Sequence, residues 1–328
     1  MSTNRCANYS LNGHNFQTAA AISLLIDHLD DFETIRNEGT EDIIISLEDG
    51  IVVYAQAKSS YDENCANSIK YFKKSLISLS ESSTMCNHHN LVHITNIKTM
   101  MGSKTERDVF PSGVTVPYES MGAVNQDLIR KYAPDDSFDF ESFAIQFLKY
   151  TDKGGNKDEW IIGKLRDDFD ERGKLLSSVS ARLVYEVWVR YLNQNGADEN
   201  NNAVCTRFIM VWGIIVQKID RVENELYQES MEDYFVVNNN YSELVEKISG
   251  RFDIISRIVG NYRIEKDVLN LVEYSFDEYA EKHWREYLDI IESISADEIV
   301  YKKILKVLIQ TVLRKMEVIR DVRKELKI

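Results

Sequence analysis

The sequence predicts a two-part chain, in which an α/β front is followed by an all-helical back. All three prolines lie before residue 135, at Pro111, Pro117 and Pro134. Because proline breaks helices, the long proline-free remainder, with apolar residues three and four positions apart, favours helix after helix. The first 130 residues instead mix short β-branched runs with helical segments. A length of 328 residues allows two domains. We place them at residues 1–195 and 203–328, joined by the polar, turn-rich segment Asn193–Asn202.

The predicted elements follow from local periodicity. In the front, apolar residues recur at helical spacing in two segments, and β-branched residues cluster in short runs between them. The front therefore contains a helix at 15–29, strands at 43–47 and 51–58, a helix at 64–80, a strand at 91–95, and a loop with one further short strand at 101–120. In the back, the same spacing predicts helices at 138–150, 157–171, 174–194, 203–233, 241–258, 264–292 and 296–326.

Composition and charge exclude some classes of protein. The chain carries 39 Lys plus Arg against 53 Asp plus Glu, a formal net charge of −14. This balance argues against a non-specific nucleic-acid coat protein, which needs a basic surface, but it allows an enzyme with a small basic cleft. The four cysteines form no CxxC pair, no apolar run is long enough to span a bilayer, and Met1–Ser10 lacks the features of a secretory signal. We therefore expect a cytoplasmic protein that does not enter a membrane.

The segment Glu38–Ser59 predicts a β-hairpin. Its centre, Glu48-Asp49-Gly50, suits a three-residue loop in which Gly50 takes the left-handed conformation. This loop length pairs Asp42 with Gln56 and gathers apolar residues on one face, whereas a two-residue loop would shift the register by one and destroy that segregation. The apolar face consists of Ile43, Ile45, Leu47, Ile51, Val53, Ala55 and Ala57.

The same register gathers three polar residues at one end of the opposite face, namely Asp42, Gln56 and Lys58. A carboxylate, an amide oxygen and an ammonium group held together can cleave a phosphodiester. Asp42 would bind Mg²⁺ or Mn²⁺, with the Gln56 side-chain carbonyl and the Ala57 backbone carbonyl as further ligands. The metal would polarise the scissile phosphate and acidify a water, while Lys58 would orient the nucleophile and stabilise the charge of the transition state. The ordinary alternative is a solvated sheet edge, where an acid before one strand and a polar-x-Lys at the end of another are common.

The pattern Asp-x13-Gln-x-Lys across a hairpin, preceded by a helix, resembles the PD-(D/E)xK nuclease superfamily in its Gln-x-Lys variant. It is most similar to the double-stranded DNA endonuclease domain of bacterial antiphage effectors, which occurs in CBASS systems and in Lamassu systems with SMC-like partners. With its helical back, the chain most resembles the nuclease subunit of a Lamassu-type complex. The similarity spans about residues 10–100 and weakens toward residue 195. The segments that carry it are Gly13–Gln17, Glu38–Ile43, Gln56–Lys58 and His93–Asn96.

The resemblance implies a restriction-endonuclease-like fold for the front, a mixed sheet flanked by helices, with Asp42, Gln56 and Lys58 as its metal and catalytic residues. It implies that Gln17 is the first-helix polar residue that faces the site. Many members of the superfamily carry a Glu there, and this chain departs from them. Glu38 or Glu41 could supply the second acid instead, although Glu41 would point away from Asp42 if the strand already begins there.

The resemblance also implies partners. They are double-stranded DNA as substrate, further copies of the chain in the active state, and an SMC-like ATPase complex bound through the C-terminal helices. The last helix fits such a role, because Tyr301–Ile328 holds nine Lys or Arg, three acidic residues and an apolar stripe at helical spacing. The same stripe would serve equally well to pack the helix on the chain's own core.

We therefore hypothesise a Mg-dependent DNA endonuclease that acts as the effector of an antiphage complex and is inactive until partner release or oligomerisation. The alternatives are a non-enzymatic helical scaffold with a degenerate nuclease front, and an RNA-cleaving nuclease that uses the same residues. A transition-metal site is a weaker candidate, since its spacing fits no standard pattern. Its residues would be Cys86, His88, His89 and His93.

Overall fold

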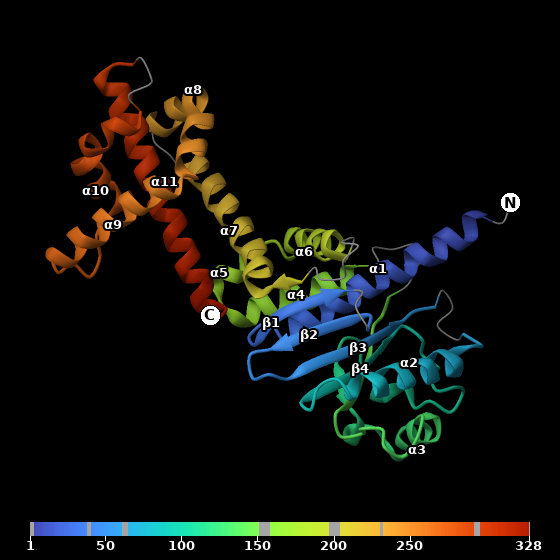
Figure 1. The fold of residues 1–328 in the computed structure, drawn as a ribbon. Coiled ribbons are helices and arrows are strands. Elements are labelled where there is room, and N and C mark those ends of the chain that lie inside the picture. The colour runs from blue at the N-terminus through green and yellow to red at the C-terminus, as the bar shows by residue number, and fades with distance from the viewer. Residues whose placement is uncertain are drawn as a thin grey trace. The chain divides into compact units, whose positions relative to one another are not determined.

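The computed structural model describes residues 3–37, 41–60, 65–150, 158–196, 204–229, 232–291 and 296–327 (Figure 1). Its contacts divide the chain into two compact units, Met1–Ile214 and Ile215–Ile328. The division falls within helix α7 (Arg207–Glu229). Residues 204–214 therefore pack with the first unit, although the sequence analysis had assigned them to the helical domain.

The first unit is built on a mixed seven-stranded sheet in the order β5-β6-β4-β3-β2-β1-β7. The pairs β3–β4 and β4–β6 are parallel, and the other pairs are antiparallel. The chain thus has the mixed α/β architecture that the sequence predicts for its front. The strands are β1 (Phe32–Asn37), β2 (Ile43–Leu47), β3 (Val52–Lys58), β4 (His89–Thr95), β5 (Thr115–Pro117), β6 (Phe143–Phe147) and β7 (Cys205–Thr206).

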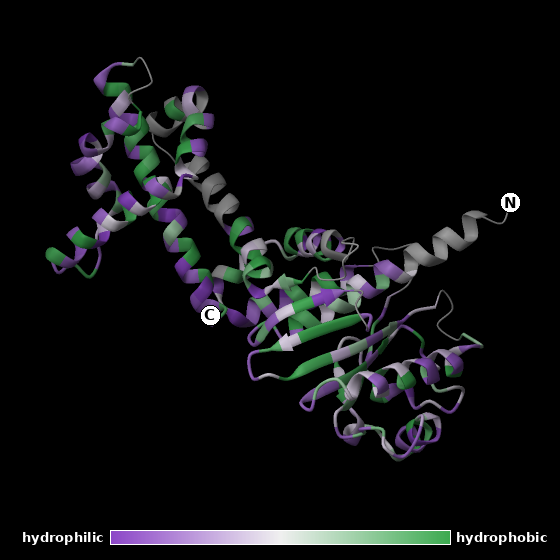
Figure 2. Cartoon of the chain, viewed as in Figure 1, coloured by the Kyte–Doolittle hydropathy of each residue, from purple (hydrophilic) through white to green (hydrophobic). Residues whose placement is uncertain are grey.

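Helices cover both faces of this sheet (Figure 1). One face packs against α1 and α6, with α4 behind them, and the other packs against α2, with α3 beyond it. Buried apolar side chains fill both layers, and in Figure 2 the central strands β2 and β3 are largely hydrophobic. The helices of this unit are α1 (Thr3–Asp27), α2 (Ser68–Ser83), α3 (Ala123–Tyr132), α4 (Glu159–Arg172), α5 (Lys174–Ser177), α6 (Ala181–Gly196) and the first part of α7. Two short 3₁₀ helices, η1 (Arg107–Val109) and η2 (Tyr118–Ser120), flank β5.

The predicted hairpin is confirmed in its loop and its register. Ile45 pairs with Val53, and Gly50 lies in the left-handed region at φ +83° with its N–H donated to the Leu47 carbonyl at 3.0 Å. The predicted apolar face is buried, apart from Ile51, which is half-buried. The separation of apolar from polar residues on the two faces therefore predicted the register correctly, because a shift by one residue would have exposed the apolar face.

Several elements of the first unit differ from the prediction, among them the expected helix 174–194, which is divided into α5 and α6, and strand β7, which lies within the expected helix 203–233. Residues 138–150 were expected to be helical, but Phe143–Phe147 forms strand β6, in which Phe143 and Ile145 are buried. The period-two alternation of Phe143, Ile145 and Phe147 was the overlooked signal. Strand β1 and helix α3 were not predicted at all, because Arg36 and Asn37 interrupt the apolar run of β1 and α3 is short and polar.

The second unit is helical, as predicted, but its helices have other boundaries. The segment expected to form one helix at 264–292 is divided, because α9 ends at Val268 and Asn270 adopts a left-handed conformation at φ 51°. The Ser275 side chain then caps the next helix by accepting from Glu278 N at 3.5 Å. The helices are the remainder of α7, then α8 (Glu232–Ser249), α9 (Phe252–Val268), α10 (Phe276–His283), the 3₁₀ helix η3 (Trp284–Ile290) and α11 (Glu298–Glu325).

Helix α11 contributes to the core of the second unit. Its apolar stripe, including Leu305, Leu308 and Val312, is buried against α8, α9, α10 and η3. The stripe therefore packs on the chain's own core. Partner binding through the basic residues of this helix stays a prediction.

Removing residues 300–328 is consequently expected to unfold the second unit. Each fully buried Leu, Ile or Val contributes roughly 1.5–3 kcal/mol, and the loss of several exceeds the roughly 5–15 kcal/mol stability of a typical domain. Amide hydrogen exchange on the truncated chain should show loss of protection in α8 and α9, with the strands of the first unit still protected. Protected α8 and α9 amides would contradict this expectation.

Candidate functional site

Asp42 and Lys58 form an ion pair at one end of the hairpin, where β2 begins and β3 ends. Asp42 lies in the bend that precedes β2, and Lys58 is the last residue of β3. The Lys58 ammonium nitrogen lies 2.8 Å from Asp42 Oδ2, which also accepts the Ala57 backbone N–H at 2.9 Å. The Asp42 side chain is 17% exposed, and the Lys58 side chain is 29% exposed. The pair is therefore fixed by the backbone yet reachable from solvent.

Gln56 lies two residues before Lys58 on the same strand and is buried. Its side-chain amide donates to Glu41 Oε2. The sequence analysis expected Glu41 to point away if the strand began at that position. Strand β2 instead begins at Ile43, and the bend before it turns Glu41 toward Gln56.

Helix α2 completes the surroundings of Glu41. Ser78 donates to Glu41 Oε1 at 2.9 Å, and Ser82 donates to the same oxygen. Glu41 is only 2% exposed. The pattern of serines on α2 was the missed signal in the sequence, since Ser75, Ser78 and Ser82 recur at spacings of three and four on the side that faces the sheet.

His93 belongs to the same polar layer. In the parallel register, it is the β4 partner of Gln56, and its Nδ1 lies 2.8 Å from Ser75 Oγ. The Phe72 ring packs edge-on against it. Burial, reinforced by the positive charge of Lys58, lowers the pKa of His93 to about 3. His93 is therefore neutral at physiological pH.

This shift predicts a pH-dependent stability. The pKa of His93 is about 3 in the folded chain, whereas its ordinary value of about 6.5 applies in the unfolded chain. As the pH falls, His93 is therefore protonated first in the unfolded chain, and this favours unfolding. The contribution is complete above pH 6.5 and is lost as the pH falls toward 3. Between pH 7 and pH 5, the free energy of unfolding of the wild type should fall by about 2 kcal/mol more than that of His93→Asn. Urea unfolding at both pH values, with EDTA present, measures this difference, and parallel pH profiles would refute it.

The ends of the two parallel strands are held by side-chain bonds to the backbone. Thr95 Oγ1 donates to the Lys58 carbonyl at 2.7 Å. The Asn96 amide donates to the carbonyls of Ser60 and Tyr150, both at 2.9 Å, and its oxygen accepts from Ser60 N at 2.8 Å. Thr95 and Asn96 therefore fix the chain at Lys58 and directly after it.

Other predicted residues are not brought to this pair. Gln17 is half-buried on α1, and within the described ranges it makes no hydrogen bond to Asp42, Gln56 or Lys58. Glu38 lies outside the described residues. Of the Cys/His candidates, His88 is exposed and His89 contacts Asp139 and the Cys86 carbonyl instead of His93. Among the described residues, no three His, Cys, Asp or Glu side chains are grouped to hold a metal.

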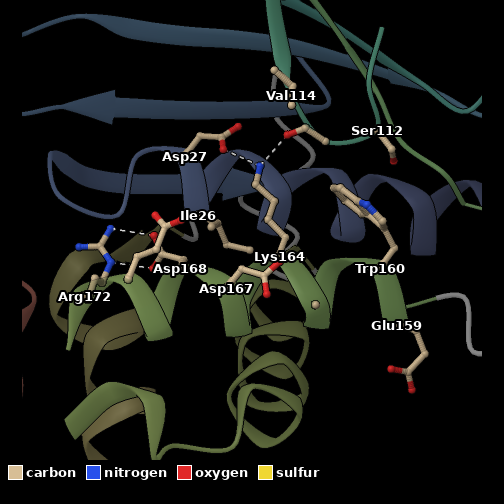
Figure 3. A pocket seen from close by; sticks show the side chains of 13 residues that line it. Ile26, Asp27, Ser112, Val114, Glu159, Trp160, Lys164, Asp167, Asp168 and Arg172 are labelled. Carbon is tan, nitrogen blue, oxygen red and sulfur yellow. Dashed lines mark hydrogen bonds and ion pairs between the residues drawn. The ribbon is translucent and has the colours of Figure 1, made fainter. Parts of the chain in front are cut away.

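A pocket of about 590 Å³ lies on the other face of the sheet, between α1, α4 and the loop before β5 (Figure 3). Lys164 points to Asp27 Oδ1 at 2.5 Å and donates to the carbonyls of Ser23 and Gly113, both at 3.0 Å. Burial lowers the pKa of Lys164, and Asp27 partly offsets this effect. Because all three contacts tie neighbouring elements together, we interpret the Lys164 cluster as structural.

The chemistry of the oxygen donors on Asp42, Gln56 and Ala57 suits a hard divalent cation. Both hydrogen bonds that the Asp42 side chain accepts within the described chain go to Oδ2, which leaves Oδ1 for a ligand. Because the Gln56 amide nitrogen faces Glu41, its carbonyl oxygen is the free end of the side chain. With the Ala57 carbonyl, this gives one carboxylate and two neutral oxygens. Mg²⁺ commonly keeps several waters and takes only one or two carboxylates from the protein, so this small set is chemically suitable.

Comparison with known proteins gives little further information. No protein-family model matches the sequence, and no curated protein matches it. Two solved structures match, both of the Acinetobacter baumannii Cap4 SAVED/CARF-domain containing receptor, with the cyclic trinucleotides 3′3′3′-cAAA and 2′3′3′-cAAA. Their identities are 14% and 13% and their TM-scores are 0.40 and 0.39. Each covers 65% of this chain, which spans 46% of the receptor chain. Likeness at this level carries no argument about function. No helix in the described ranges has the length and apolar character required to cross a membrane.

Proposed function

We propose that this chain is a metal-dependent endonuclease that hydrolyses phosphodiester bonds of double-stranded DNA. The observation that supports it most directly is the contact of 2.8 Å between the Lys58 ammonium nitrogen and Asp42, two residues after Gln56 on β3. The Asp42 carboxylate is also held by the backbone, and the neighbouring buried amide has a fixed partner of its own. Here Ala57 N fixes Asp42, and Glu41 fixes Gln56.

The proposed reaction is hydrolysis. A water oxygen forms a new bond to phosphorus, the bond from phosphorus to the leaving sugar oxygen breaks, and the water proton is lost to solvent while the leaving oxygen gains one. A bound Mg²⁺ or Mn²⁺, held by Asp42, Gln56 and Ala57, would supply polarisation of the phosphate. Lys58 would donate hydrogen bonds to the attacking water and to a non-bridging oxygen, and thereby stabilise the negative charge that develops.

A cationic surface for the substrate is available on helix α2, which also carries the serines that hold Glu41. Its exposed residues include Lys70, Lys73 and Lys74. Lysines contribute phosphate contacts that do not depend on sequence. This local positive surface is compatible with a chain whose net charge is −14.

The biological role that we propose rests on the motif resemblance alone. It is that of an antiphage effector, held inactive with SMC-like partners and activated by release or oligomerisation. A nuclease restrained in this way should show a steep dependence of cleavage on protein concentration. Full activity of a monomer at low concentration would contradict the restraint.

The test of the activity is conversion of supercoiled plasmid to nicked and linear forms with Mg²⁺ or Mn²⁺, comparing wild type with Asp42→Asn. Asp49→Asn, in the exposed loop of the same hairpin, is the matched control. We expect cleavage by the wild type and the control, no cleavage in EDTA, and none by Asp42→Asn. Equal cleavage by all three proteins would refute the site. A parallel RNA substrate decides between the two nuclease alternatives, and absence of cleavage at every concentration, with partners present, would favour the scaffold.

A further inference from the structure

We infer that Glu41 is a positioning residue, which fixes the Gln56 amide so that its carbonyl oxygen faces the Asp42–Lys58 pair. The inference deepens the proposed function and rests on the metal site proposed there. It assigns to Glu41 a role other than the second metal-binding acid that the sequence suggested.

The first step in the argument is the burial of Glu41. Its side chain lies under α2 and is 2% exposed. A carboxylate in such a place must be hydrogen-bonded, since an unpaired buried charge is strongly unfavourable. Three donors meet it here, from Gln56, Ser78 and Ser82.

The second step is how these donors are distributed. Both serine hydroxyls donate to Oε1, and the Gln56 amide donates to Oε2. Both carboxylate oxygens are therefore occupied by protein donors. A metal ligand would have to give up at least one of these bonds, whereas Asp42 keeps Oδ1 for a ligand within the described contacts. The distribution favours positioning over ligation.

The third step concerns which end of the Gln56 amide faces Glu41. An ionised carboxylate only accepts hydrogen bonds, so only the NH₂ end of the Gln56 amide can face Glu41. The oxygen end must then face the other way. If residue 41 were an amide, it could present either a donor or an acceptor, and the orientation of Gln56 would no longer be determined. The negative charge, rather than the size of Glu41, is therefore what orders the site.

The test compares Glu41→Gln, which keeps the volume, with Glu81→Gln, the same change at an exposed position of α2. Isothermal titration with Mn²⁺ should give about tenfold weaker binding for Glu41→Gln and unchanged binding for Glu81→Gln, because residues that orient ligands typically affect metal affinity by about 10–100-fold. Equal affinity of wild type and Glu41→Gln would overturn the inference.

A second readout does not depend on the metal. With Gln-selective ¹⁵N labelling, the Gln56 side-chain NH₂ of the wild type should exchange slowly with water, as expected for a buried donor to a carboxylate. In Glu41→Gln, this protection should be lost. An unprotected Gln56 amide in the wild type would also overturn the inference.

A third variant provides an independent test if Glu41→Gln folds poorly. The double change Ser78→Ala/Ser82→Ala leaves Glu41 and Gln56 in place but removes the donors to Oε1. It should weaken Mn²⁺ binding in the same direction, and unchanged binding would count against the proposed network. If wild type binds no Mn²⁺ while its Gln56 amide is protected, the proposed function fails and the positioning of Gln56 stands.

Discussion

Replacing Lys58 by alanine is expected to slow plasmid cleavage by about 10²–10³-fold, the cost typical of losing one group that stabilises transition-state charge. Lys58 carries the positive charge nearest to Asp42 in the described structure. The fold should survive, because a partly exposed ion pair contributes roughly 0–1 kcal/mol. Single-turnover cleavage rates, with the melting temperature measured in parallel, check both parts of this prediction.

Two further variants show whether the effect belongs to the site. Lys74→Ala removes the same charge from an exposed position of α2 and should reduce cleavage only by weakening DNA binding, an effect that lower salt reverses. Lys58→Arg keeps the charge but changes its geometry, and should restore only part of the rate. If Lys58→Ala cleaved as fast as Lys74→Ala at low salt, Lys58 would have no catalytic role.

Replacing Gly113 by alanine is expected to lower the free energy of unfolding of the first unit by about 3 kcal/mol. Two costs combine at this position. Gly113 lies in the left-handed region at φ +78°, and a Cβ placed there would overlap the six-membered ring of Trp160. The Gly113 carbonyl also accepts from Lys164 at 3.0 Å, so movement of the loop would disturb the attachment of α4 (Figure 3). Urea unfolding of the two proteins measures the difference.

The hairpin supplies a matched control for the backbone part of this cost. Gly50 has nearly the same conformation, at φ +83°, but open space around its Cβ position. Gly50→Ala should therefore cost only about 1–2 kcal/mol, which is the left-handed penalty alone. Adding Trp160→Ala to Gly113→Ala should recover the steric part in a double-mutant cycle. Equal losses for the two glycine variants would show that Trp160 does not restrict the loop.

Part of the candidate site can be predicted from the sequence pattern of the hairpin alone. The hairpin register, in which Ile43 pairs with Ala55, depends only on loop length and on which residues are apolar, and both are properties of one short segment. This register brings Asp42, just before β2, to Lys58 at the end of β3. The roles of these residues in binding a metal and in catalysis remain predictions.

The remainder of the site depends on contacts between segments far apart in the chain. Glu41 meets Ser78 and Ser82 across 37 and 41 residues. His93 reaches Gln56 only because β4 adds to the sheet in parallel beside β3. The residue spacing within each segment does not predict which distant residue it will contact. The serine spacing on α2 predicts only that this helix has a polar side toward the sheet.

The sequence by itself determined the α/β character of the front, the hairpin and its register, and the helical character of the back, because each follows from side-chain periodicity within one element. Only the tertiary structure decided that Phe143–Phe147 is a strand, since that segment completes its hydrogen bonds with β4 and β5. It also decided that Glu41 is turned inward, because a buried carboxylate is stable only where donors from another element meet it. Periodicity is local, whereas hydrogen-bond satisfaction is a property of the whole fold.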